Sequence, residues 1–171
     1  RFFPLQPIRS MSENLIPSVH FNSLSDLEAT YWWHQTRLEL AENIIRRNHL
    51  TTVKMNVVDY GCGTGGFLHQ LNERMSFENY LGVDISYEAI QKALKFGDHF
   101  RQIDPFDFSM LSNAEMVFLM DALEHVEDDA EFLKNLVDGM KPGANLLISV
   151  PAMPQFYSSW DKALGHHRRY S

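Results

Sequence analysis

One short glycine-rich segment constrains the fold more than any other part of the chain. Residues 57–66 read VVDYGCGTGG, an apolar stretch that stops at Asp59 and continues into four glycines within six residues. Glycine adopts positive φ without strain and lets the backbone approach a ligand closely, and a helix that starts just beyond offers free N–H groups to an electronegative group. The segment therefore predicts a buried strand, a tight turn and a helix that together form a nucleotide-type cradle.

The glycine spacing fits two ligand-binding patterns at once. The dinucleotide pattern G-x-G-x-x-G begins at Gly61 and ends at Gly66, whereas the pattern D-x-G-x-G-x-G begins at Asp59 and ends at Gly65. Glycines alone do not distinguish the two. A carboxylate at Asp59 gains nothing beside a pyrophosphate, but it suits a ligand that carries an ammonium group. Asp59 therefore favours a cationic ligand, and a dinucleotide such as NAD stays open as the alternative.

Length and composition limit the organisation of the chain. At 171 residues it is long enough for one domain with a full core, and we expect an irregular arm at 1–22 and one folded domain at 23–171. The net charge of −7 argues against a nucleic-acid partner. No apolar run approaches the roughly 20 residues of a membrane span. Cys62 is the only cysteine, which excludes an internal disulfide and favours a reducing, cytoplasmic location.

Apolar runs alternate with helical patterns along the domain, an order typical of βαβ units. We expect strands near residues 55–60, 80–83, 100–103, 115–120 and 145–150, and helices near 25–48, 65–74, 86–96 and 128–140. Ligands of parallel sheets bind beyond the carboxyl ends of the strands. The acids at the ends of the first four strands are Asp59, Asp84, Asp104 and Asp121. Their convergence predicts a binding site in an α/β, doubly wound, mostly parallel sheet.

The first expected helix carries a second possible part of the site. Ser25 and Glu28 form a capping-box pattern at its start. Trp33 and Arg37 are four residues apart and therefore lie on the same face. One interpretation makes this face core with a solvated rim, and the other places the helix across the mouth of the cradle.

Asp84 has two interpretations. It stands 23 residues after Gly61 at the end of the second expected strand, where a carboxylate can accept hydrogen bonds from both ribose hydroxyls. Alternatively it helps to cap the next helix, which has Ser86 as its expected N-cap. The distance from the glycines favours ribose binding, a feature that dehydrogenases share.

Several segments together resemble the class I methyltransferases that use S-adenosylmethionine. They are residues 57–65, 81–84, 123–128 and 136–151, the last with a Lys-Pro-Gly turn. The group they resemble most is the small-molecule methyltransferase domains, which include ubiquinone-biosynthesis O-methyltransferase relatives. A dehydrogenase would not be expected to carry the Leu-Glu-His-Val segment at 123–126. The resemblance implies a Rossmann-like fold, S-adenosylmethionine as the cofactor and methyl transfer as the activity.

The resemblance also implies which residues hold the cofactor. Asp59 and the glycine turn would hold its methionine end, and Asp84 its ribose. Asp104 would meet the adenine, with Asp107 as the rival acid. The expected cofactor-binding residues are Arg37, Asp59, Gly61, Cys62, Gly63, Gly65, Asp84, Ile85, Asp104, Asp121, Ala122 and Leu123. The last three would form the wall beside the sulfonium.

The resemblance predicts a shortened sheet. The family fold continues with a helix and two further strands, and this chain stops at Ser171, where that helix would start. Without those strands the fifth strand would be an edge with unpaired backbone groups. We therefore expect a class I methyltransferase fold that lacks its C-terminal strands, either as a fragment or as a chain that relies on a partner such as a second copy. Glu115 replaces the family's usual aspartate at an edge position, where we expect little effect.

The chemistry calls for a group that removes a proton, because methyl transfer from a sulfonium is an in-line displacement onto a positioned acceptor. His125 is the first candidate, since it follows the fourth strand and histidine titrates near neutral pH, and a capping or core role is its alternative. Trp33, His167, Arg168 and Tyr170 are the expected substrate residues, and the arginine would hold an anionic acceptor. A solvated basic loop is the alternative for this cluster. No metal-ligand spacing occurs, so we expect no metal.

Three functions are compatible with these features. The first is S-adenosylmethionine-dependent methylation of a small-molecule acceptor. The second is a cofactor-binding module that is not catalytic by itself, which the shortened sheet suggests. The third is an NAD-dependent oxidoreductase, and Asp59 is the residue that argues against it.

Overall fold

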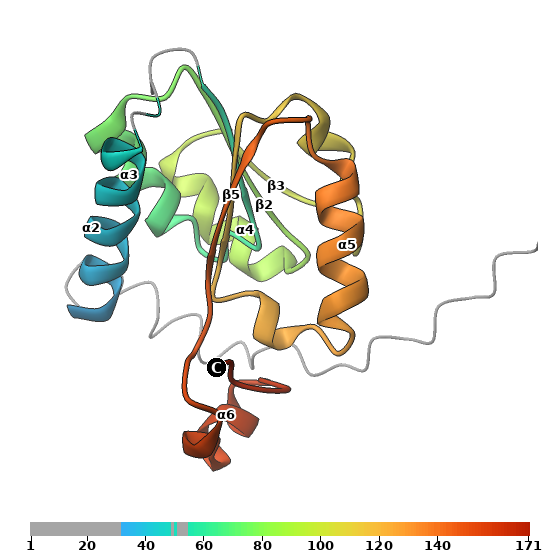
Figure 1. Cartoon of the computed structure of the whole chain (residues 1–171). Coiled ribbons are helices and arrows are strands. Elements are labelled where there is room, and N and C mark those ends of the chain that lie inside the picture. The colour runs from blue at the N-terminus through green and yellow to red at the C-terminus, as the bar shows by residue number, and fades with distance from the viewer. Residues whose placement is uncertain (1–31, 49, 51–54) are drawn as a thin grey trace, which may run out of the picture.

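The computed structural model describes residues 32–48, 50 and 55–171 (Figure 1). The expected arm at 1–22 and the capping box at Ser25 and Glu28 lie outside these residues. The strands are β1 (Asn56–Tyr60), β2 (Asn79–Asp84), β3 (Phe100–Gln102), β4 (Met116–Met120) and β5 (Asn145–Ser149). The helices are α2 (Trp32–Arg47), α3 (Gly66–Met75), α4 (Tyr87–Ala93), α5 (Asp129–Gly139) and α6 (Ser159–Ala163).

The five strands form one sheet in the order β3-β2-β1-β4-β5, and every pair is parallel. β1 lies at the centre, where Asp59 is opposite Gly82 of β2 and Phe118 of β4. The chain moves outward from β1 to β3 on one side and then returns to build β4 and β5 on the other. The expected doubly wound sheet is confirmed, and ligands of such sheets bind at the carboxyl ends of the strands beside this change of direction.

Helices cover both faces of the sheet (Figure 1). One apolar cluster joins the sheet to α2, α3 and α4, and a second joins it to α5. Leu68 and Leu71 of α3 and Leu136 of α5 are fully buried in these two layers. Burial of each such side chain contributes about 1.5–3 kcal/mol, so the two apolar layers are what hold the strand ends in place.

The helix starts follow local capping rules. The Ser86 hydroxyl accepts a hydrogen bond from Ala89 N, and the Asp128 carboxylate accepts one from Glu131 N, so both residues cap the helices that follow them. The expected helix 86–96 is divided, because α4 ends at Ala93 and a 3₁₀ turn covers Leu94–Phe96. The other expected elements agree with the structure to within one or two residues at each end that lies within the described residues; the expected start of the first helix, near Ser25, lies outside them.

Glu115 has a structural role that the sequence did not suggest. Its carboxylate accepts a hydrogen bond from Asn56 N at 2.8 Å and forms an ion pair with Lys141 at 2.5 Å. Asn56 begins β1, and Lys141 lies in the turn before β5. Glu115 therefore links three neighbouring segments at the edge of the sheet opposite the site.

Beyond β5 the chain forms a small unit that we call the cap, residues 151–171, which lies at the carboxyl ends of the strands (Figure 1). Its two ends are joined by hydrogen bonds from Met153 N to Tyr170 O and from Tyr170 N to Pro151 O, each 2.8 Å long. Between them Ser158 is the N-cap of α6 and forms a complete capping box with Asp161. Among the described helices none is long and apolar enough to cross a membrane.

Candidate functional site

The glycine turn after β1 has the geometry of a ligand cradle. Gly61, Gly63 and Gly65 have φ of 80°, 55° and 81°, values that side-chain-bearing residues rarely adopt. A Cβ on Gly61 would lie 2.8 Å from Cβ of Ala122, whereas a Cβ on Gly63 would meet nothing within 4 Å. The turn is thus packed against the segment after β4 on one side and open on the other. An open glycine backbone just before a helix start fits close approach by a nucleotide-type ligand.

Carboxylates brace this cradle from two strands. Asp59 of β1 is buried, with 1% of its surface exposed. Asp84 at the end of β2 accepts hydrogen bonds from Gly63 N at 2.9 Å and from Ser86 N at 2.8 Å. Burial raises the pKa of Asp84, and the backbone donors partly offset that effect. Asp84 therefore connects the glycine turn to the start of α4, and its role toward a ribose stays a prediction.

The expected adenine residues are less confined. Asp104 follows β3 and is exposed, and Asp107 accepts a hydrogen bond from Ser109 N at 3.0 Å. That bond is the main cause of the lowered pKa of Asp107. Gln102 donates to the carbonyl of Ile85 at 3.0 Å and so ties the end of β3 to the segment beside Asp84. The structure places both acids near the correct strand end without choosing between them.

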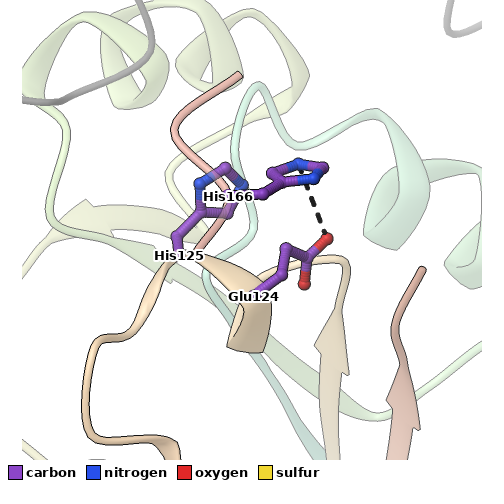
Figure 2. Close-up of side chains that lie close together, drawn as sticks. All are labelled: Glu124, His125 and His166. Atoms are coloured by element: carbon purple, nitrogen blue, oxygen red, sulfur yellow. Dashed lines mark ion pairs between the residues drawn. The ribbon is translucent and has the colours of Figure 1, made fainter. Parts of the chain in front are cut away.

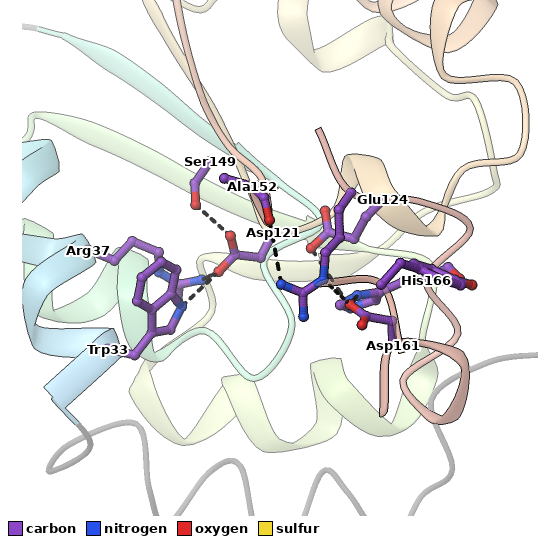
Figure 3. Close-up of polar contacts among 10 residues, drawn as sticks. Trp33, Arg37, Asp121, Glu124, Ser149, Ala152, Asp161 and His166 are labelled. Atoms are coloured by element: carbon purple, nitrogen blue, oxygen red, sulfur yellow. Dashed lines mark hydrogen bonds and ion pairs between the residues drawn. The ribbon is translucent and has the colours of Figure 1, made fainter. Parts of the chain in front are cut away.

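Asp121, just after β4, is the centre of a second polar cluster (Figure 3). It accepts hydrogen bonds from Arg37 at 2.6 Å, Trp33 at 3.4 Å and Ser149 at 2.5 Å. Its φ of 53° is unusual for a residue other than glycine. The helix α2 thus reaches across to the ends of β4 and β5, as one of the two interpretations of Trp33 and Arg37 predicted.

Arg37 retains unused hydrogen-bonding capacity. Its guanidinium lies 5.2 Å from the centre of the Phe67 ring, and its side chain is 13% exposed. The Nε atom is buried and has no hydrogen-bond partner among the described residues. A buried donor without a partner costs about 1–3 kcal/mol, so this atom fits an acceptor group on a bound ligand.

A third group joins the segment after β4 to the cap (Figure 2). Glu124 and His125 lie in the 3₁₀ turn Leu123–His125, and His166 comes from the cap. One ligand-type atom from each of the three lies within 4.8 Å of the others. Histidine and glutamate can bind metals as well as protons. Spacing along the sequence did not indicate this group, because folding of the cap is what brings His166 to it.

Burial controls the charges in this group. It raises the pKa of Glu124 to about 8, and the nearby Asp121 carboxylate adds to the increase. Burial is the main cause that lowers the pKa of His125 to about 4, and the neighbouring His166 is the second. Both side chains are therefore mostly uncharged near neutral pH.

The expected substrate residues of the cap have partners inside the protein. Arg168 pairs with Asp129 at 2.9 Å and also donates to the Glu127 carbonyl, and Tyr170 donates to Asp129 at 2.8 Å. Burial, followed by the bond to Asp129, raises the pKa of Tyr170. His167 is exposed. Because Asp129 already balances the charge of Arg168, the role of this arginine toward an anionic acceptor stays a prediction with less support.

The sequence did not point to Ser149 or Asp161 as members of these clusters, and it suggested no catalytic role for His166. Ser149 ends β5 beside Asp121, and Asp161 and His166 lie in the cap. The signal that could have pointed to Asp161 is its position three residues after Ser158, a capping-box spacing. For His166 the signal is the run of two histidines and two arginines at 166–169, which predicts a loop over the site but does not distinguish His166 from His167.

Comparison with known proteins gives relatives by sequence. A methyltransferase domain family matches residues 32–170. The mitochondrial ubiquinone biosynthesis O-methyltransferase of Schizosaccharomyces pombe is 29% identical over 173 residues, which cover 86% of this chain and 58% of that protein. A trans-aconitate 2-methyltransferase of Deinococcus radiodurans is 32% identical over 97 residues, which cover 56% of this chain and 38% of that protein. The chain thus spans little more than half the length of the ubiquinone relative.

Solved structures share the fold of this chain. An N-methyltransferase of Haemonchus contortus, solved with phosphomonomethylethanolamine and S-adenosylhomocysteine, superposes with a TM-score of 0.72 at 18% identity over 96% of this chain and 42% of that chain. A methyltransferase in complex with the Trm112 activator of Haloferax volcanii gives 0.63 at 20% identity over 88% and 70%. Likeness at such low identity concerns the fold alone. The sequence match over residues 32–170 covers most of the chain, and the chain belongs to the methyltransferase domain family.

Proposed function

We propose that this domain transfers a methyl group from S-adenosylmethionine to a small-molecule acceptor. The observation that carries the proposal is the cradle at the carboxyl edge of the sheet. Three glycines at positive φ form its turn, the buried Asp59 precedes them, and Asp84 accepts a hydrogen bond from Gly63 N. Membership in the methyltransferase domain family supports the same reading.

The residues present fit the cofactor by their chemistry. When bound, S-adenosylmethionine supplies an activated methyl group on a sulfonium. Asp59 and the glycine turn would hold its amino-acid end, and Asp84 would accept from its ribose. Nε of Arg37, which has no hydrogen-bond partner within the described part of the chain, would donate to its carboxylate. Asp121, Ala122 and Leu123 would form the wall beside the methyl group.

Two other functions have weaker support. An NAD-dependent oxidoreductase would share the glycine turn, but it would gain nothing from the buried Asp59 beside a pyrophosphate. A cofactor-binding module that is not catalytic by itself stays possible for a chain that spans 58% of the length of its ubiquinone relative. Turnover separates this second alternative from the proposal.

The test is a transfer assay with the full chain, S-adenosylmethionine labelled in its methyl group, and oxygen acceptors of two kinds. The probes are 3,4-dihydroxybenzoate, a phenol, and trans-aconitate, a carboxylate. Transfer of label to either probe, with S-adenosylhomocysteine released in equal amount, supports the proposal and identifies the acceptor class. Binding of S-adenosylhomocysteine without transfer to any acceptor would favour the non-catalytic module.

Location and assembly complete the proposal. A single cysteine that cannot form an internal disulfide supports a cytoplasmic location. In the described residues β5 pairs only with β4. The backbone groups along its other side could pair with a second copy of the chain, and we propose a homodimer on this ground. Light scattering on the purified chain distinguishes a homodimer from a monomer.

A further inference from the structure

His166 is held in place through its backbone and its ring. Its N–H donates to the Asp161 carbonyl at 2.9 Å, and its carbonyl accepts from the Tyr157 hydroxyl at 2.7 Å. The N–H of the next residue donates to the Glu124 carbonyl at 2.7 Å. The His166 ring lies edge-on to the ring of His125, with centroids 4.8 Å apart. Such anchoring is what a group that acts on a reacting atom requires.

Asp161 decides which ring nitrogen of His166 carries the proton. Nδ1 of His166 is 3.2 Å from Oδ1 of the fully buried Asp161. Oδ1 also accepts from Arg169, and Oδ2 accepts from Ser158 N. The hydrogen bond from Arg169 holds the pKa of Asp161 well below its usual range. An ionised carboxylate can only accept, so Nδ1 donates, and in the neutral ring this leaves Nε2 as an acceptor.

Nε2 of His166 faces the buried carboxyl of Glu124 (Figure 2). It lies 4.0 Å from Oε1, a distance too long for a hydrogen bond. Oε2 of Glu124 has no hydrogen-bond partner among the described residues. A hydroxyl group that enters here would find Nε2 as an acceptor for its proton and the Glu124 carboxyl as a second partner.

This group lies beside the cofactor cradle. Ala122 packs against Gly61 so closely that a Cβ on the glycine would come within 2.8 Å. Glu124 follows two residues later in the 3₁₀ turn Leu123–His125. The cap therefore brings His166 to the wall of the cradle beside which the methyl group would lie.

We propose that His166 is the catalytic residue that accepts the proton of the methyl acceptor, with Asp161 as its positioning residue. This inference rests on the proposed function. The acceptor's heteroatom forms a bond to the methyl carbon while the carbon–sulfur bond breaks and its electron pair stays on sulfur. The proton of that heteroatom moves to Nε2 of His166. The Asp161 carboxylate balances the imidazolium until the proton leaves to water.

This assignment replaces His125, the base that the sequence suggested. Burial lowers the pKa of His125 to about 4, and its ring forms a hydrogen bond with the Gly165 backbone. A base whose pKa lies far below the working pH has little tendency to take a proton. The His125 ring instead packs edge-on against the ring of His166.

The kinetic test compares His166→Gln and Asp161→Asn with His99→Gln, a matched change at an exposed histidine before β3, at the opposite edge of the sheet. With 3,4-dihydroxybenzoate, whose phenol must lose a proton on methylation, we expect His166→Gln to lower kcat by about 10²–10⁴-fold, with affinity for S-adenosylhomocysteine unchanged. Asp161→Asn should lower kcat by less, and added imidazole should restore part of the activity of His166→Gly. A kcat within threefold of the wild type in His166→Gln would overturn the proposal. A chelator that lowers kcat of the wild type as much as His166→Gln does would also overturn it, because the group would then hold a metal ion.

A second test does not depend on turnover. Nitrogen NMR spectra of the imidazole rings in the full chain at neutral pH, with the His166 signal assigned by its loss in His166→Gln, report its tautomer. We expect a proton on Nδ1 of His166, and a redistribution of the tautomers in Asp161→Asn. A proton on Nε2 overturns the inference even if methyl transfer is observed. If no probe is methylated, the proposed function fails while the tautomer still decides this inference.

Discussion

Asp59, Asp84 and Asp121 lie at one edge of the sheet, but their surroundings give them different tasks. Asp59 is buried on the central strand, Asp84 accepts two backbone N–H groups, and Asp121 is balanced by Arg37. Asp59 and Asp84 can be tested most directly, because substitution by asparagine removes the charge of each side chain while keeping its shape.

Asp59→Asn and Asp84→Asn should each weaken binding of S-adenosylhomocysteine by about tenfold or more, since a hydrogen bond to a charged group contributes about 1.5–3 kcal/mol. Isothermal titration calorimetry measures the change, and circular dichroism checks the fold. Asp98→Asn, at an exposed aspartate before β3, is the matched control and should leave the affinity unchanged. Unchanged affinity in both site variants would show that the cofactor is held elsewhere.

Glu124 predicts a dependence of stability on pH. Its pKa is raised to about 8 in the folded chain from an ordinary value of 4.5, so its contribution is fully present below 4.5 and is lost as the pH rises toward 8. Between pH 6 and 8 the wild type should lose about 2 kcal/mol of unfolding free energy relative to Glu124→Gln. The depressed pKa of His125 acts in the opposite direction, and it cancels in this comparison because both proteins carry it. Urea unfolding of both proteins at pH 6 and pH 8 measures the difference. An equal change in the free energy of unfolding of the two proteins would show that the pKa of Glu124 is not raised.

Among the elements, strands and helices followed from the sequence more closely than the contacts between distant segments did. The strands were predictable because apolar runs stop at polar residues, and Ser86 and Asp128 act as caps through bonds to residues only three positions away. The pairing of Arg168 with Asp129, and the approach of His166 to Glu124, join segments about forty residues apart. Local pattern carries no information about such contacts, which depend on how the cap folds.

The glycine turn offers a matched pair of substitutions. Gly61→Ala introduces both backbone strain at φ +80° and a contact of 2.8 Å with Ala122, whereas Gly143→Ala introduces strain at φ +82° with open space around the new methyl group. We expect about 1 kcal/mol of destabilisation from Gly143→Ala and about 2–3 kcal/mol from Gly61→Ala. Only Gly61→Ala should also weaken binding of S-adenosylhomocysteine. Equal destabilisation in urea unfolding, with equal affinity, would contradict the packing of this turn.

The ion pair of Arg37 and Asp121 should couple α2 to the end of β4. A double-mutant cycle with Arg37→Gln and Asp121→Asn should give a coupling energy of about 1–2 kcal/mol, because both side chains are mostly buried. The exposed pair Lys134–Asp138 within α5 is the control, and its coupling energy should be clearly smaller because solvent screens both charges. A coupling no larger than that of the control would mean that α2 is held by apolar packing alone.

In the whole molecule, three segments far apart in sequence meet at one edge of the sheet. The glycine turn follows β1, α2 reaches Asp121, and the cap brings His166 to Glu124 (Figure 3). The parallel sheet and the strand-end acids could be predicted because their order follows from the alternation of strands and helices. What pairs with the outer edge of β5 could not be predicted, since the chain spans 58% of the length of its ubiquinone relative.

Calorimetric titration of the full chain with S-adenosylhomocysteine, with NAD as the comparison, decides whether the carboxyl ends of these strands bind S-adenosylmethionine. We predict binding of S-adenosylhomocysteine with a Kd near the micromolar range, which corresponds to about 8 kcal/mol, and no binding of NAD. Binding of NAD, with none of S-adenosylhomocysteine, would contradict the account.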